Sequence, residues 1–231
     1  MAMSKQLAGL ALGLVAMCTA AHAAPADAET IDTSATNLIV VLREAAGENK
    51  QDEALQPYGR VTAELPDGKR IMFAPSWYYY LGDMIIRLVF DGGQSLQSAS
   101  PGDLERLGLT AEQALDRAVV NLRRMYGAPQ AAPWDGGLMQ VQGQATDLAS
   151  SYFLDRDFWA SQAKSHPDGL IAAVPQRGGL VFAAADDADA IDALRFSAAA
   201  LYAGGGGRHI SSALYLFKDG RWSIFQAPQG Q

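Results

Sequence analysis

The residues with the most distinctive chemistry lie near the C-terminus, where four glycines precede an arginine and a histidine over 204–209. Consecutive glycine amides can form a concave anion-binding nest, and an arginine adds a planar fork of donors for a carboxylate or a phosphate. The alternative is a flexible connection from a helix to a strand, because glycine leaves the backbone free. A Walker-type phosphate loop would need Gly-Lys-Ser/Thr, which the run lacks. The candidate anion-binding residues are Gly205, Gly206, Gly207, Arg208 and His209.

Metal-ligand patterns are absent from the sequence. His166 and His209 are the two histidines after residue 23, and neither has a partner at the paired spacing of a zinc site. The acidic run over 186–189 lacks the glycine and the distal glutamate of an EF-hand loop. Acidic residues also suit a helix N-terminus, where they interact favourably with the helix dipole. We therefore predict no metal site, and no motif predicts a cofactor.

A hydrolase triad can be drawn from Ser150 or Ser151 with His166 and Asp168. Neither serine lies in the Gly-x-Ser-x-Gly turn that exposes such a nucleophile. Small side chains beside Ala149 are instead typical of close helix packing. The sequence therefore identifies no catalytic residue.

Four consecutive aromatic residues over 77–80 could form a platform for a sugar or a peptide. Side chains alternate between the two faces of a strand, so at most two of the four can share a surface. The alternative is burial in the core, where large aromatic side chains contribute most to packing.

The first residues have the pattern of a secretory signal peptide. Lys5 is the only charge before Asp27, an apolar run follows over 7–16, and Ala21-His22-Ala23 fits a cleavage site. The run is too short for a membrane-spanning helix; the alternative is a buried N-terminal helix. We predict a signal peptide over 1–23, a mobile leader over 24–33, and a periplasmic or secreted protein.

Cys18 raises the question of a lipid anchor. A lipoprotein signal places the cysteine after a small residue, whereas Met17 stands there, so the sequence argues against lipidation. Removal of the signal peptide would leave a mature chain without cysteine. Disulfides, thiol nucleophiles and thiolate metal sites would then be excluded together.

The charge balance narrows the classes of partner. The formal net charge of the 231 residues is −7 at pH 7, and no block of basic residues offsets it. Nucleic-acid backbones and anionic lipid surfaces would repel such a chain. No second apolar run approaches the length of a membrane span, so we expect a soluble protein whose partner is a small anionic ligand or another protein.

The clearest helix follows a capping box formed by Thr110 and Gln113. Apolar residues then recur at helical spacing until Gly127 and Pro129 end the helix. The composition predicts two further helices, over 147–162 and 187–203.

Turn residues predict the strands. Hairpins are expected where 66–68 separates 61–65 from 70–73, and where Lys218-Asp219-Gly220 separates 214–217 from 222–225. The segment 38–42 is either a buried strand or the middle of a helix. Residues 128–137 have the composition of a linker. The expected fold is α+β, a mostly antiparallel sheet of hairpins with packed helices, in one domain over 34–231 with a possible internal boundary near 128–137.

Four short blocks resemble the YtpQ-type family, a bacterial domain of unknown function. They lie at 103–110, 147–154, 169–175 and 214–220, and the resemblance covers roughly 85–226. It implies a fold class and a chain boundary, but no activity. Two features depart from the family: the export signal, since its members are usually cytoplasmic, and Gly178-Gly179, where an acidic residue is usual. Any role of that carboxylate is lost or moved here.

Two functions of different classes follow from the sequence. The first is a non-enzymatic binding or interaction protein, because no catalytic set, metal spacing or dinucleotide loop is recognisable. The second is a periplasmic enzyme, most plausibly a hydrolase, whose residues are scattered along the chain. Convergence of Arg208, His209 and a carboxylate in a cleft would favour the enzyme.

Overall fold

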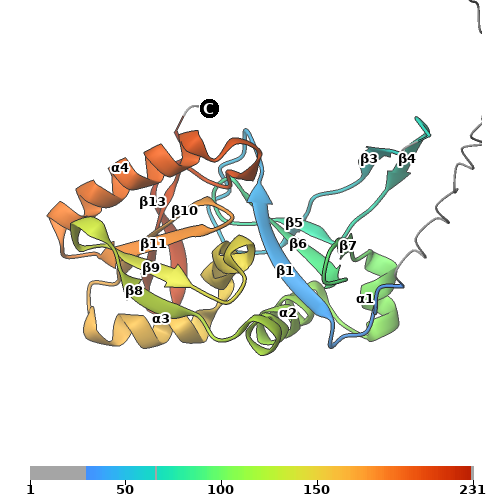
Figure 1. Ribbon diagram of the computed structural model, residues 1–231, viewed down its shortest axis with the longest axis horizontal. Coiled ribbons are helices and arrows are strands. Elements are labelled where there is room, and N and C mark those ends of the chain that lie inside the picture. The colour runs from blue at the N-terminus through green and yellow to red at the C-terminus, as the bar shows by residue number, and fades with distance from the viewer. Residues whose placement is uncertain (1–29, 66, 230–231) are drawn as a thin grey trace, which may run out of the picture. The chain divides into compact units, whose positions relative to one another are not determined.

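The computed structural model describes residues 30–65 and 67–229. The predicted signal peptide, Cys18 and residues 24–29 of the predicted leader lie outside these ranges. Residues from Ile31 onward belong to one unit, an α+β fold with three antiparallel sheets (Figure 1). The end of the predicted mobile leader is held in place, since Asn37 donates to the carbonyl of Asp32 and Arg106 to that of Thr33.

The first sheet has the strand order β1-β6-β5-β2, with β7 also paired to β6. Its strands are β1 (Leu38–Glu44), β2 (Gln56–Pro57), β5 (Trp77–Tyr79), β6 (Met84–Asp91) and β7 (Leu96–Ser98). The ambiguous segment 38–42 is therefore a strand. It is buried on both faces, which explains why it reads as a continuous apolar run without alternation.

The second sheet has the order β13-β12-β10-β11-β9-β8. Its strands are β8 (Gln130–Pro133), β9 (Met139–Gln142), β10 (Leu170–Gln176), β11 (Gly179–Ala184), β12 (Leu214–Lys218) and β13 (Arg221–Gln226). The expectation of a linker over 128–137 was wrong, because β8 pairs with β9 there and a 3₁₀ turn, η1 (Asp135–Gly137), follows. The chain nevertheless passes from the first sheet to the second at this segment.

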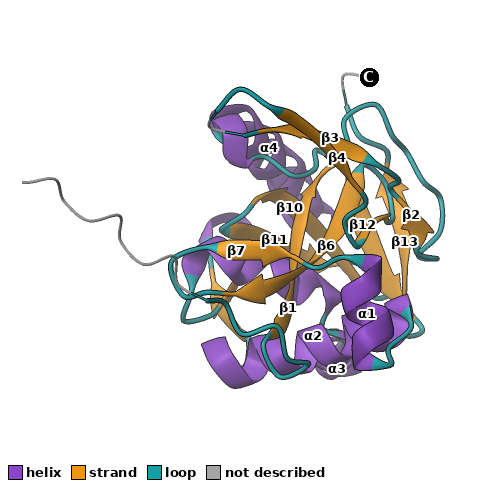
Figure 2. Cartoon of the chain, turned by 90° about the vertical axis from the view of Figure 1, so that its right-hand side faces the viewer, coloured by secondary structure: helices purple, strands orange, loops and turns teal. Residues whose placement is uncertain are grey.

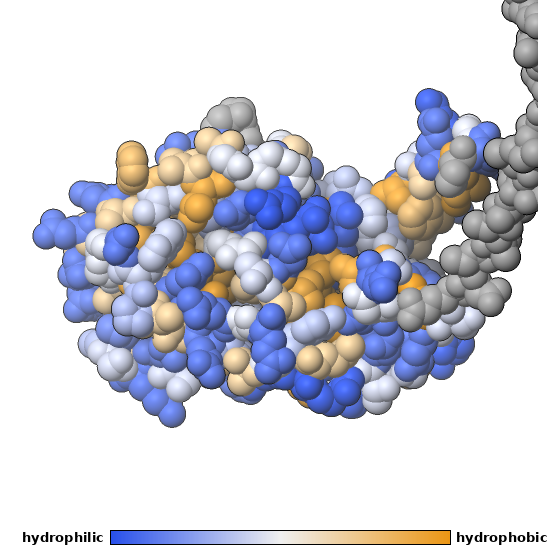
Figure 3. Space-filling model, in the orientation of Figure 1, coloured by the Kyte–Doolittle hydropathy of each residue, from blue (hydrophilic) through white to orange (hydrophobic). Residues whose placement is uncertain are grey.

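The third sheet is the predicted hairpin of β3 (Val61–Glu64) and β4 (Arg70–Phe73). It projects from the strands of the first sheet (Figure 1). Ile71 and Met72 are exposed on it, and its apolar surface is visible in Figure 3.

Capping determines where the helices begin. A capping box starts α1 (Pro101–Leu107) at Ser100, and the predicted box of Thr110 and Gln113 starts α2 (Ala111–Tyr126). The predicted last helix is α4 (Ala188–Gly204), with Asp187 at its N-cap. α2 packs on β1, whereas α4 covers β10 and β11 of the second sheet. Figure 2 shows α1 and α2 on one side of the strands, away from α4.

The expected helix over 147–162 is broken in its middle. A 3₁₀ helix, η2 (Thr146–Leu154), precedes α3 (Arg156–Gln162), and one further 3₁₀ turn, η3 (Ala163–Ser165), follows. The break lies at Asp155, which has φ −83° and ψ 87° and caps α3 by accepting from the amide of Phe158. Arg123 of α2 forms an ion pair with the buried Asp155 carboxylate, so a tertiary contact overrides the helical composition.

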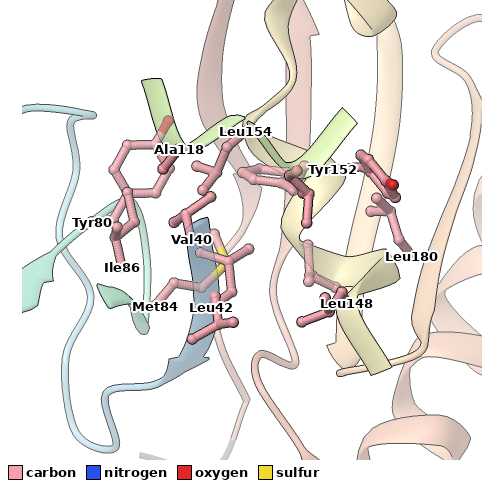
Figure 4. Close-up of a cluster of buried hydrophobic side chains, with 14 of the residues drawn as sticks. Val40, Leu42, Tyr80, Met84, Ile86, Ala118, Leu148, Tyr152, Leu154 and Leu180 are labelled. Atoms are coloured by element: carbon pink, nitrogen blue, oxygen red, sulfur yellow. The ribbon is translucent and has the colours of Figure 1, made fainter. Parts of the chain in front are cut away.

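The main core lies around η2. Side chains of β1, β6, α2, η2 and β11 belong to one buried cluster (Figure 4). Aromatic rings extend it: Phe153 stacks on Trp222, with centroids 4.1 Å apart, and the indole of Trp159 donates to the carbonyl of Tyr152. A second cluster lies beneath α4. Within the described ranges, no helix is long and apolar enough to cross a membrane.

Candidate functional site

Two arginines share one face of the first sheet. Arg87 of β6 is paired directly with Val41 of β1 and with Trp77 of β5. Arg43 lies two residues after Val41, so its side chain projects to the same face. The guanidinium carbon of Arg87 lies 3.7 Å from the centroid of the Trp77 ring, a cation–π contact.

A third arginine comes from the second sheet. Arg177 lies in the turn between β10 and β11, where its amide donates to the carbonyl of Arg208 and its carbonyl accepts from the amide of Ser150. Its guanidinium donates to the carbonyl of Gly207 at 3.4 Å. Both η2 and the glycine-rich run therefore hold Arg177 in place.

The three guanidinium groups influence one another electrostatically. Burial, together with the charges of Arg177 and Arg87, lowers the pKa of Arg43 to about 10. Burial also lowers the pKa of Arg87, and Arg177 adds to that effect. Asp147, an exposed residue of η2, is the carboxylate that acts on Arg43. Arginine carries its charge at neutral pH, so the three side chains form a local excess of positive charge.

Arg43 donates to the carbonyl of Leu42 at 2.7 Å, but three donors of this group have no acceptor within the described chain. The buried Nε atoms of Arg87 and Arg177 and the indole nitrogen of Trp77 have no hydrogen-bond partner. Nor does any of the three arginines form an ion pair with a carboxylate among residues 30–65 and 67–229. An unpaired buried donor costs roughly 1–3 kcal/mol. We call Arg43, Arg87, Arg177 and Trp77 the arginine cluster.

Aromatic rings border the arginine cluster. Tyr58 packs against Trp77 and Tyr79, with centroids 5.8 and 4.9 Å away. Tyr78 and Tyr80 are buried on the opposite face. The expected alternation along this aromatic run is confirmed: Trp77 and Tyr79 lie on the face of the cluster, and the other two belong to the core.

The glycine-rich run lies beside the cluster but uses most of its amides internally. It forms a 3₁₀ turn, η4 (Gly206–Arg208), in which Arg208 donates to the carbonyl of Gly205 and His209 to that of Gly206. The amide of Gly205 donates to the last turn of α4. The Arg208 side chain is exposed. The run thus contributes the Gly207 carbonyl that orients Arg177, and two amides, of Gly206 and Gly207, remain for a ligand.

His209 lies within ion-pair distance of the carboxylate of Glu44. Its Nε2 lies 2.7 Å from Oε2 of Glu44, and the hydroxyl of Tyr202 donates to the other carboxylate oxygen. In Figure 1 the segment after α4 lies beside the end of β1, where Figure 3 shows a strongly hydrophilic surface. Glu44 and Arg43 are adjacent on β1 and project to opposite faces. No hydrogen bond between described residues joins His209 to a serine or threonine hydroxyl, so the pair lacks a nucleophile.

The other sequence candidates are dispersed. Ser150 and Ser151 are buried in η2, and no hydrogen bond links either hydroxyl to His166 or Asp168. Asp168 lies 3.6 Å from the ammonium group of Lys218 instead. The carboxylates over 186–189 lie at the start of α4, as expected for a helix N-terminus. Among the residues that the structure places, no group of three or more histidine, cysteine or acidic side chains could hold a metal ion.

Sequence reasoning did not identify the arginine cluster. Its members are far apart in the sequence, and no spacing pattern connects them. A weak signal existed: Arg87 interrupts the apolar run of β6, and Arg43 directly follows the apolar run of β1. A charged residue in such a strand is unusual unless it is paired, so it marks a position to inspect.

Comparisons with protein-family models, with curated proteins and with solved structures find no match to this chain. The resemblance to the YtpQ-type family therefore stays a prediction from its short motifs. Function has to be inferred from the chemistry of the site.

Proposed function

We propose that this chain is an exported, non-enzymatic binding protein that holds a small anion at the arginine cluster. The observation that carries the proposal is the convergence of three guanidinium groups without a carboxylate partner in the described chain. An anion would offset the repulsion between the three positive charges.

The geometry favours a carboxylate or a phosphate as the bound group. Guanidinium forks bind both in a bidentate way, and partial burial strengthens each contact. Arg43 and Arg87 approach from the first sheet and Arg177 from the second, so the ligand would contact both sheets. The neighbouring Tyr58 and Tyr79 could pack against an apolar or cyclic part of the ligand.

Thermal unfolding of the purified chain against a panel of anions tests the proposal. The panel contains phosphate, sulfate, citrate, simple carboxylates and sugar phosphates. A ligand at about a hundred times its dissociation constant adds about 2.7 kcal/mol to the free energy of unfolding, which raises Tm by several degrees. We expect such a shift for at least one anion, and we expect it to disappear in Arg43→Ala and Arg177→Ala.

Arg208→Ala is the matched control, because Arg208 lies close to Arg177 in the structure but its side chain is exposed. Its Tm shift should match that of the unaltered chain. A shift lost in Arg208→Ala but kept in Arg177→Ala would assign binding to the glycine-rich run instead. If no anion changes Tm, the proposed function is wrong.

A further inference from the structure

A second concave surface lies along α2, outside the arginine cluster. It is a groove of about 660 Å³ between α2, the segment 53–55 and the start of α3. Its floor is apolar, formed by Leu55, Leu115, Val119 and Leu154. Val120 stands at its edge with 58% of its surface exposed. We call this surface the α2 groove.

The charges around the α2 groove are mostly negative. Its lining contains five carboxylates and two guanidiniums, from Glu53, Glu112, Asp116, Asp155, Asp157, Arg123 and Arg156. Both arginines are already paired: Arg123 with Asp155 and Asp157, and Arg156 with Glu53. The carboxylates that project from α2 have no ion-pair partner in the part of the chain described by the structure. These are Glu112 and Asp116, both exposed.

The groove continues beyond its central part. A hollow of about 490 Å³ shares Asp116 and Val120 with it, and another of about 530 Å³ shares Glu53 and Arg156. Small-molecule sites are usually compact clefts or cavities of about 300–1,000 Å³. A row of connected hollows suits an extended chain better than a compact ligand.

We infer that the α2 groove binds an extended peptide segment of a partner protein, with lysine or arginine side chains alternating with apolar ones. In an extended peptide, alternate side chains face opposite sides. The apolar side chains would occupy the floor, and the outward-facing basic ones would bend along the surface to reach Glu112 and Asp116 at the rim. The net charge of −7 attracts such a partner over a longer range.

This inference does not depend on the proposed function. The α2 groove and the arginine cluster share no residue, and they select opposite charges. Loss of one activity would therefore leave the other intact.

Fluorescence anisotropy with a labelled synthetic peptide tests the inference. The probe alternates leucine and lysine over about twelve residues, which spans about 40 Å when extended. Two comparison peptides replace leucine by serine, or lysine by glutamate. We expect the leucine–lysine peptide to bind the native chain at least tenfold more tightly than either comparison peptide. Equal binding of the serine–lysine peptide would overturn the inference, because charge alone would then explain the binding.

Charge reversal locates the site. Glu112→Lys with Asp116→Lys should weaken binding of the leucine–lysine peptide about tenfold, which corresponds to about 1.4 kcal/mol. The matched control is Asp186→Lys with Asp189→Lys, which changes the net charge equally but lies at the start of α4. The control should bind within about twofold of the native chain, and circular dichroism should show that both variants are folded. Equal loss in both double variants would overturn the inference.

Two further outcomes would assign the groove to another occupant. If spermidine binds tightly by itself and displaces the peptide, the groove is a site for small cations. If sedimentation shows a dimer that Glu112→Lys with Asp116→Lys dissociates, the occupant is a second copy of this chain. Either result overturns the peptide assignment.

Discussion

The buried carboxyl of Asp83 leads to a prediction with a definite sign. Asp83 lies in the turn between β5 and β6 and is 1% exposed. The hydroxyl of Tyr215 in β12 donates to it at 3.2 Å, and Ser211 and Glu44 also lie near it. Burial raises its pKa from the ordinary 3.8 to about 6, with a smaller contribution from the Glu44 charge. No described lysine or arginine forms an ion pair with this carboxyl.

The magnitude follows from proton linkage. A pKa of about 6 in the folded state, against 3.8 in the unfolded state, corresponds to about 3 kcal/mol. Because the folded state holds the proton more tightly, protonation of Asp83 stabilises the folded state, and this stabilisation is complete below about pH 4. It is lost as the pH rises to about 6, and it remains lost at neutral pH. Asp83→Asn keeps the side-chain shape and an acceptor for Tyr215 without the charge, so it should raise the free energy of unfolding near pH 7 by up to about 3 kcal/mol.

Urea unfolding, followed by tryptophan fluorescence between about pH 4 and pH 7, measures the effect. The stability difference between Asp83→Asn and the native chain should be near zero at about pH 4 and should grow as the pH rises through about 6. Asp186→Asn, at an exposed position, serves as the control and should show a difference that does not change with pH. If Asp83→Asn is less stable than the native chain near pH 7, the reasoning is refuted, because the ionised carboxyl would then be stabilising.

Two further substitutions test the packing. Gly82→Ala should lower the free energy of unfolding by at least about 2 kcal/mol, because Gly82 has φ +65° and an added Cβ would lie 2.5 Å from the Tyr215 hydroxyl. Urea unfolding would measure this loss of stability. An unfolding midpoint equal to that of the native chain would contradict the prediction. Asn121→Ala should lower the free energy of unfolding by about 2 kcal/mol in the same assay, because the buried Asn121 amide donates to the carbonyls of Ala35 and Leu38 at 2.8 Å each. A decrease of less than about 0.5 kcal/mol would show that water replaces both hydrogen bonds.

The elements that the sequence predicted well have local signals. The capping box of Thr110 and Gln113 fixes the start of α2 through contacts three residues apart. The β12–β13 hairpin follows from its turn, since Asp219 and Gly220 have φ values of +52° and +75°. Positive φ at both positions is what a two-residue turn of this kind requires, and aspartate followed by glycine adopts it readily.

Elements without local signals depend on partners elsewhere in the chain. Residues 130–133, predicted as a linker, form β8 because β9 offers a free edge, and Pro133 is tolerated because β8 is an edge strand. The break at Asp155 depends on Arg123, which precedes it by 32 residues. The arginine cluster depends on both sheets. Composition and periodicity describe only neighbours in sequence, so they could not reveal these contacts.

The position of the arginine cluster would connect the proposed anion binding with the contact between the two sheets. Arg43 and Arg87 belong to the first sheet and Arg177 to the second, so repulsion between them opposes the contact of the sheets. The contacts of Glu44 with His209 and of Asp83 with Tyr215 hold the same sheets together. An anion at the cluster would turn the repulsion into attraction, so its binding energy should appear as greater stability of the contact between the sheets.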